Sequence, residues 1–203
     1  KQTLQKLLPL LKASEKPEWQ AHIDELRAKE ASGQDNRPGM TPFNVLSKLN
    51  GYLNANTPVA TDVGQHQMWT AQRYMFKEPR TFVTSGGLGT MGFGMGAAIG
   101  ACMATGERAV LVTGDGSFGM NLNELATAVA NKVPLVILLL NNGVLGMVRQ
   151  WQTLFFGKRY SSTILERKTD FVKLAEAFGA KAARAETIEE FETAFKEAMA
   201  HDG

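Results

Sequence analysis

The sequence contains a single cysteine, Cys102, and this scarcity excludes a disulfide within the chain. Cys102 lies in the small-residue run AAIGACMA, so we interpret it as a core residue rather than a nucleophile. Long apolar runs are also missing, because the longest are far shorter than the ~20 residues of a membrane-spanning helix. No signal peptide opens the chain. We therefore expect a cytoplasmic protein in a reducing compartment, without a membrane partner.

An excess of charge of one sign is missing as well. Lys and Arg number 22 against 20 Asp and Glu, which leaves a formal net charge of +2. Like charges form no block, and this argues against nucleic acid as a partner. The 203 residues, 44% hydrophobic and 21% charged, are typical of a globular chain that can bury a full core.

Apolar runs alternate with helical patterns along most of the chain. This order predicts an α/β fold, a doubly wound parallel sheet with helices on both faces. The expected strands are 58–61, 81–84, 109–112, 135–140 and a weak fifth at 181–186. The expected helices are 41–53, 91–105, 122–129, 145–155, 170–179 and 187–200.

Two segments lie outside this alternation and define the expected domains. Residues 1–30 carry two helical patterns, and the polar stretch 32–38 is typical of a linker. We therefore interpret 1–37 as the helical tail of a preceding domain plus a linker, and 38–203 as a second domain. The chain ends in a turn after a helix, where such a fold would normally add a strand, so we expect this domain to be truncated at its C-terminus.

The stretch from Gly114 to Gly146 carries the most informative polar residues. The apolar runs 109–112 and 135–140 are each followed within three residues by a polar side chain, Asp115 and Asn142. A helical pattern lies between the two runs. Since parallel strands end at the same edge of a sheet, these side chains are expected close together, where α/β folds bind ligands.

This pair favours a magnesium and diphosphate site. Mg²⁺ prefers oxygen ligands and binds through one or two protein side chains plus phosphate. The glycines at 114, 116 and 143 allow close approach of an anion, and a helix expected to begin near Gly119 would direct its N–H groups there. The alternative is that Asp115-Gly116 and Asn142-Gly143 are only turns at two strand ends.

A glycine-rich loop at 87–92 matches the dinucleotide pattern G-x-G-x-x-G. The acidic residue expected about 20 residues later falls at Glu107, before the next strand begins. A lone match of this kind is weak evidence, so a nicotinamide dehydrogenase stays a minor alternative. The phosphate-binding pattern Gly-Lys-Ser/Thr does not occur in the sequence.

Four motifs in order resemble one family. They are TDVGQHQMW (61–69), TSGGLGTMGFG (84–94), GDGSFGMNLNELATA (114–128) and LLLNNGVLGMVRQWQ (138–152). The spacing of GDG, 24 residues and NN resembles the thiamine-diphosphate fingerprint, and the flanking text resembles the large catalytic subunit of the acetohydroxyacid (acetolactate) synthases. The resemblance covers residues 41–203 and implies the last, diphosphate-binding domain of a three-domain chain, with the thiamine-diphosphate-binding fold.

The resemblance implies a role for each matching residue. Asp115 and Asn142 would bind Mg²⁺ by their side chains, and Val144 by its main-chain oxygen. Met91, the catalytic residue of the set, would bend the cofactor with its side chain and contact the aminopyrimidine through its N–H, as Gly89 would through its carbonyl. The remaining cofactor-binding positions would be Gly64, Gln65, His66, Gly114, Gly116, Ser117, Leu145, Gly146 and Met147. Met147 and Trp151 would contact the second 2-ketoacid.

The resemblance also implies the reaction and the partners. The full enzyme would condense pyruvate with pyruvate or 2-ketobutyrate, with decarboxylation, in branched-chain amino acid biosynthesis. The glutamate that activates the cofactor would come from the pyrimidine-binding domain of a second subunit, so the fragment alone is expected to be inactive. FAD would bind mainly outside this chain. A homo-oligomer, dimer or tetramer, and a small regulatory subunit would complete the assembly.

Two further interpretations stay open. The chain could belong to another thiamine-diphosphate-dependent decarboxylase or carboligase, although the run GMVRQWQ with Trp151 argues against this. It could also be an isolated module that binds the cofactor without catalysis.

Overall fold

The computed structural model describes residues 1–32, 37–166 and 168–202. The chain divides into two compact units, Lys1–Asn36 and Arg37–Gly203, each with its own internal contacts. Residues 33–36 of the predicted linker lie outside the described residues. In the described part of the chain, no helix has the length and apolar character needed to cross a membrane.

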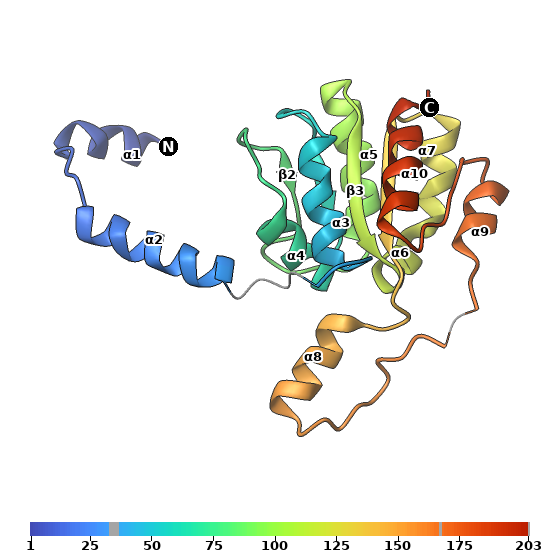
Figure 1. The fold of residues 1–203 in the computed structure, drawn as a ribbon. Helices are drawn as coiled ribbons and strands as arrows, with labels where there is room; N and C mark the ends of the chain where they lie inside the picture. The colour runs from blue at the N-terminus through green and yellow to red at the C-terminus, as the bar shows by residue number, and fades with distance from the viewer. Residues whose placement is uncertain (33–36, 167, 203) are drawn as a thin grey trace. The chain divides into compact units, whose positions relative to one another are not determined.

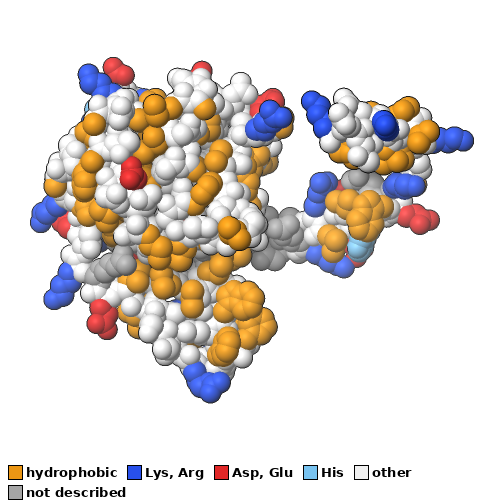
Figure 2. Space-filling view, turned by 180° about the vertical axis from the view of Figure 1, so that it is seen from behind, with side chains coloured by type: hydrophobic (Ala, Val, Ile, Leu, Met, Phe, Trp, Pro, Cys, Tyr) orange, Lys and Arg blue, Asp and Glu red, His pale blue; other side chains and the backbone are white. Residues whose placement is uncertain are grey.

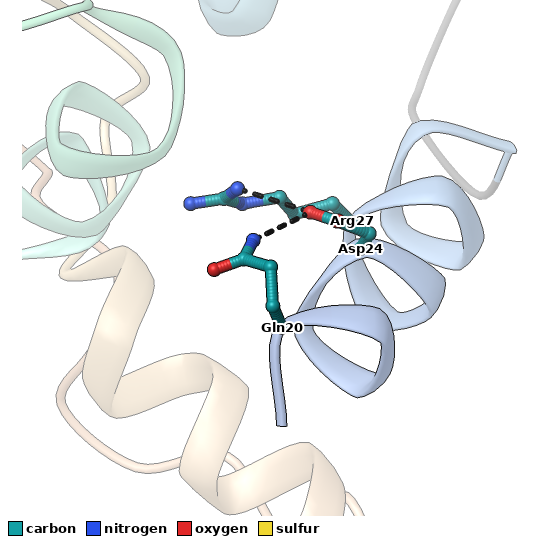
Figure 3. A network of polar contacts seen from close by, with 3 residues as sticks. All are labelled: Gln20, Asp24 and Arg27. Carbon is teal, nitrogen blue, oxygen red and sulfur yellow. Dashed lines mark hydrogen bonds and ion pairs between the residues drawn. The ribbon is translucent and has the colours of Figure 1, made fainter. Parts of the chain in front are cut away.

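The first unit consists of one short helix, one 3-10 turn and one longer helix, with little burial of side chains among residues 1–29. They are α1 (Gln2–Leu7), η1 (Leu8–Leu10) and α2 (Pro17–Ser32). Polar contacts line the surface of α2: the Asp24 carboxylate accepts hydrogen bonds from Gln20, 3.0 Å away, and from Arg27 at 3.4 Å (Figure 3). Residues 1–29 are all exposed except the half-buried Ile23, so their apolar side chains find no core within this unit.

The second unit is built on a sheet of four parallel strands in the described residues (Figure 1). The strands lie in the order β2-β1-β3-β4. Their bounds are β1 Val59–Thr61, β2 Phe82–Val83, β3 Ala109–Gly114 and β4 Leu135–Leu140. The chain therefore leaves β1 toward one edge and, after β2, returns past β1 to build the other half of the sheet.

Helices cover both faces of this sheet, which confirms the doubly wound fold. On one face lie α3 (Pro42–Lys48) with η2 (Leu49–Gly51), α4 (Gln65–Arg73) and α10 (Ile188–Ala200). On the other lie α5 (Phe93–Thr105), α6 (Asp115–Asn121) with η3 (Leu122–Glu124), α7 (Leu125–Ala130) and α9 (Phe171–Ala177). Successive β3 residues point to opposite faces: Val110 enters one core and Leu111 the other. The buried Cys102 belongs to the α5 core, as expected from its small-residue run.

Several helices begin where the sequence predicts. Thr41 caps α3 by accepting a hydrogen bond from Asn44 N, and Pro42 occupies the first turn. Asp170 caps α9 through its side chain, and Thr187 forms a capping box with Glu190 at the start of α10.

Two predictions about elements are wrong. Residues 181–186 form no strand, because this alanine-rich stretch has weak strand preference and a groove of about 1410 Å³ lies between it and β4. The helix expected near Gly119 begins at Asp115, directly after β3, with Gly114 as its N-cap. The helical pattern that follows is divided into α6, η3 and α7.

Candidate functional site

The strand order places a topological switch point between β1 and β3, and we call the region outside the carboxyl ends of these two strands the crevice. These strands are neighbours, yet the connections after them lead to opposite halves of the sheet. Ligands of doubly wound folds bind at such a switch point, outside the carboxyl ends of the strands. The residues after β1 and β3, 62–67 and 114–117, therefore form the candidate site.

The His66 ring lies against Gly64, in the loop after β1, and Gly114, the last residue of β3. A Cβ on Gly64 would lie 2.7 Å from this ring, and a Cβ on Gly114 would lie 2.9 Å from its Nδ1, so both glycines are needed to accommodate the imidazole. The side chain is only 7% exposed. Burial lowers the pKa of His66 from its ordinary 6.5 to about 4, although a hydrogen bond to the Asp62 backbone raises it slightly. The ring is therefore neutral at pH 7.

The other ring nitrogen of His66 has no protein partner. Within the part of the chain that the structure describes, Nε2 is the buried side-chain nitrogen or oxygen atom left without a hydrogen bond. Such groups are rare in native structures and call for a ligand or water. The neutral ring has one N–H, which Nδ1 uses toward the Asp62 backbone, so Nε2 would donate to an anionic oxygen only in the protonated ring, a form that a nearby anion favours.

The structure brings Asp115 and the 142–144 loop together, as their places after β3 and β4 predict. The register pairs Gly114 with Leu140, so the two strands end at the same level. The buried Asp115 carboxylate accepts a hydrogen bond from Gly143 N at 3.1 Å. Asn142 Oδ1 accepts one from Val144 N at 3.0 Å. Asp115 Oδ2 and Asn142 Oδ1 each have a further lone pair that could bind a cation.

The side-chain oxygens of Asp115 and Asn142 suit a hard cation that is bound together with phosphate. The described residues contain no cluster of three or more His, Cys, Asp or Glu that could hold a metal ion. Mg²⁺ in phosphate sites needs only one or two protein side chains and takes its other ligands from phosphate and water. The carboxylate of Asp115 and the carboxamide of Asn142 meet that requirement.

A third loop, 84–92, lies over the same crevice. Its turn is closed by a 3.0 Å hydrogen bond from Thr90 N to Ser85 Oγ. Gly89 is exposed with a positive φ of 63°, and a Cβ there would lie 3.9 Å from Val63. The half-buried Met91 points its methyl group toward Gly116, where a Cβ would lie 3.8 Å from it.

Ser117 and Gln65 use their side chains within the protein. The Ser117 hydroxyl donates to Val63 O at 2.7 Å, which joins the start of α6 to the loop after β1. Gln65 donates to Gln150 Oε1 at 2.8 Å, and its own Oε1 lies directly against Gly146. Their side chains therefore position loops, which leaves main-chain N–H groups for contact with an anion.

The site borders α8 (Gly146–Phe155), which extends away from the sheet (Figure 1). Leu145, just before the helix, lies against Gly116, where a Cβ would be 2.6 Å from its Cδ2. Met147 is half-buried in the first turn. Trp151 is 56% exposed, and its ring lies tilted at 43° to that of Phe155, with 5.1 Å between the ring centroids. The structure thus brings the start of α8 to the crevice but leaves Trp151 facing outward.

The chain returns to this loop after α8. Leu145 N donates to Thr163 O and Leu165 N donates to Gly143 O, both at 2.8 Å. These bonds form the antiparallel bridge between Val144 and Ile164. The segment 163–165 therefore fixes the backbone around the predicted metal-binding carbonyl of Val144, a support that the sequence did not indicate.

Sequence reasoning also missed Asp62 and Gln150. Asp62 directly follows β1, as Asp115 follows β3, and that strand-end position was the available signal. Its carboxylate is 1% exposed and accepts a hydrogen bond from Gly92 N at 2.7 Å. The role of Gln150 depends on contact with Gln65, 85 residues earlier, and no local pattern reveals it.

A family model and several known proteins match this chain. The model, described as "Thiamine pyrophosphate enzyme, C-terminal TPP binding domain", matches residues 62–203. The acetolactate synthase isozyme 2 large subunit of Escherichia coli (strain K12) is 44% identical over 201 residues, 96% of this chain and 36% of that protein. The mitochondrial acetolactate synthase catalytic subunit of Saccharomyces cerevisiae is 43% identical over 208 residues, 98% of this chain and 30% of that protein.

A third relative matches a shorter part of the chain at higher identity. The probable acetolactate synthase large subunit of Methanococcus aeolicus is 49% identical over 156 residues, 76% of this chain and 26% of that protein. The chain thus spans about a third, or less, of the length of these curated relatives.

Proposed function

Because this chain belongs to the thiamine pyrophosphate enzymes, whose C-terminal cofactor-binding domain it carries, we propose that it is the diphosphate-binding domain of an acetolactate synthase. The observation that carries this proposal is the crevice between β1 and β3. There the His66 ring, whose Nε2 has no partner, lies against Gly64 and Gly114, beside the loops of Asp115 and Asn142. Thiamine pyrophosphate, also called thiamine diphosphate, has an anionic end that suits these groups.

The residues present fit such a cofactor. Asp115 and Asn142 would bind Mg²⁺ through their side chains, and Val144 through its main-chain oxygen. When protonated, His66 would donate from Nε2 to a diphosphate oxygen, and the first-turn N–H groups of Gly116 and Ser117, which lack intrahelical acceptors, would do the same. Gly114 keeps the strand end clear of side-chain atoms beside His66.

The loop at 84–92 would receive the other end of the cofactor. When bound, thiamine diphosphate would supply carbanion chemistry for reactions at the carbonyl of a 2-ketoacid. Met91 would hold the cofactor bent with its side chain, which already points over Gly116, so that the reacting groups stay close. Gly89 O and Met91 N would bind the aminopyrimidine ring.

The remaining cofactor-binding positions lie where α8 meets the crevice. Gly64 and Gln65 begin α4, and the Gln65 side chain would keep Gly146 and the first turn of α8 beside the diphosphate. Leu145 and Met147 would cover the metal and the thiazolium ring from this side.

Exposed apolar side chains on α8 support a partner domain over the site. Figure 2 shows hydrophobic side chains gathered on the part of the molecule that projects below the sheet. Those more than 40% exposed in this segment are Val148, Trp151, Leu154, Phe155, Phe156, Tyr160 and Ile164. Contiguous exposed apolar surface marks an interaction site. A pyrimidine-binding domain of a second subunit would cover it and supply the glutamate that activates the cofactor.

The substrates and assembly belong to the same proposal. Pyruvate would be decarboxylated and joined to pyruvate or 2-ketobutyrate for branched-chain amino acid biosynthesis, with Met147 and Trp151 in contact with the second ketoacid. FAD would bind mainly outside this chain, in a cytoplasmic homo-oligomer with a small regulatory subunit. Residues 1–37 would form the tail of a preceding domain, and 38–203 the diphosphate-binding domain.

Calorimetric titration of the chain with thiamine diphosphate tests the cofactor site. We expect binding with Mg²⁺ that is lost with EDTA and weakened at least about tenfold by Asp115→Ala, because one metal ligand is removed. Asp170→Ala is the matched control, since this exposed carboxylate also accepts backbone hydrogen bonds but caps α9. Equal binding in EDTA, or in the Asp115 variant, would overturn the metal assignment.

A further inference from the structure

The carboxylate of Asp62 joins three parts of the candidate site. Oδ1 accepts hydrogen bonds from Val63 N at 3.1 Å and from Gly92 N at 2.7 Å. Oδ2 accepts one from the Thr113 hydroxyl at 3.3 Å, and Gly94 N contributes another. The end of β1, the end of β3 and the start of α5 thus meet at one side chain that is 1% exposed.

Asp62 also takes the place of a helix cap for α5. The N-cap residue of this helix is Gly92, which has a positive φ of 85° and no side chain to accept a first-turn N–H. Free N–H groups and the positive end of the helix dipole favour a carboxylate at this position. Asp62 supplies it from the loop after β1, 30 residues earlier.

Close packing keeps the helix start against this carboxylate. A Cβ on Gly94 would lie 2.9 Å from Asp62 N and 2.8 Å from Leu111 Cδ1, so only glycine lets α5 approach β1 and β3 this closely. The backbone of residues 92–94 is therefore held against Asp62 both by close packing and by hydrogen bonds.

Met91 is the residue directly before this fixed turn. We propose that Asp62 is a positioning residue that holds the Gly92 N–H and thereby fixes Met91 in the place where it bends the cofactor. The inference rests on the proposed function and assigns to Asp62 a role in the geometry of catalysis. A carboxylate is well suited to it because one side chain accepts several hydrogen bonds from different directions.

Hydrogen exchange in the full-length protein tests this role with two readouts. The first is amide exchange of residues 89–94 without cofactor, which Asp62→Ala should accelerate at least about tenfold because the Gly92 acceptor is lost. The second is deuterium exchange at C2 of bound thiamine diphosphate, which should slow by a similar factor because Met91 no longer holds the bend. The dissociation constant of the cofactor should change less than about threefold, since the diphosphate ligands stay.

Matched variants separate positioning from stability. Asp62→Asn keeps a neutral acceptor for Gly92 and should restore C2 exchange to within about threefold of wild type. The C2 exchange rate of Asp62→Ser, whose acceptor is shorter, should lie between the rates of the Asn and Ala variants. Asp62→Ser also replaces Asp62→Ala in these experiments if the alanine variant does not fold. In a Met91→Ala background, Asp62→Ala or Asp62→Ser should slow C2 exchange by less than about twofold further, because the residue through which Asp62 acts is gone.

The outcomes distinguish this inference from the proposed function. If the wild-type protein does not bind thiamine diphosphate, both fail. If it binds the cofactor and C2 exchange is unchanged in Asp62→Ala or Asp62→Ser, only the role of Asp62 is overturned. Equal slowing in the wild-type and Met91→Ala backgrounds would also overturn it, because Asp62 would then act independently of Met91.

Discussion

Replacement of His66 by glutamine should make the chain less sensitive to acid. The imidazole is buried and neutral, with a pKa lowered from 6.5 to about 4 by burial. Between these two values the unfolded chain binds a proton that the folded chain excludes, so stability must fall as the pH decreases from 6.5. Above pH 6.5 both states are neutral at this position, and the loss disappears.

The expected magnitude follows from the size of the shift. The difference between 6.5 and about 4 corresponds to about 3 kcal/mol of unfolding free energy, at about 1.4 kcal/mol per pH unit. Burial raises the pKa of Asp62, which acts in the opposite sense as the pH falls. Only the difference between wild type and His66→Gln therefore isolates the contribution of the histidine.

Urea unfolding without cofactor, followed by circular dichroism between about pH 4 and pH 8, measures this difference. The wild-type chain should lose about 3 kcal/mol more than His66→Gln over this range. His201→Gln is the control, since it removes an exposed imidazole from the same unit. Parallel stability curves for wild type and His66→Gln would refute the inference that His66 is buried neutral.

Three further changes test the fold and the proposed function. Gly94→Ala should cost about 1–3 kcal/mol in urea unfolding, because its Cβ would overlap Leu111 and the Asp62 backbone; no loss would contradict the close packing of α5. Thr187→Ala should cost about 1 kcal/mol by removing the α10 cap, and unchanged stability would show that the capping box contributes nothing. In the full-length protein, Trp151→Leu should lower the proportion of product formed from 2-ketobutyrate in competition with pyruvate, and an unchanged product ratio would count against substrate contact.

Sequence reasoning located the parts of the site that depend on strand ends. Asp115 and Asn142 each follow an apolar run, and parallel strands joined by one helical crossover must end at the same edge. The pairing of Gly114 with Leu140 confirms that expectation. The parallel sheet and the capped helices α3, α9 and α10 could be predicted for similar reasons, because their signals lie within a few residues.

Features that depend on distant neighbours could not be predicted. The Gln65 side chain is hydrogen-bonded to Gln150 on α8, 85 residues later. The Ser117 hydroxyl binds the Val63 carbonyl, and the direction of either side chain is set by tertiary contacts. Residues 181–186 contain no β-branched or aromatic residue to favour a strand, so the expected fifth strand rested on the alternation of elements alone.

The bridge between Val144 and Ile164 joins the two ends of the segment that carries α8. The two ends meet through hydrogen bonds from Leu145 to Thr163 and from Leu165 to Gly143. A loop whose ends are already joined can change in length at little entropic cost to the rest of the protein. Changes in length between residues 146 and 162 should therefore leave the strand ends beside the bridge in place.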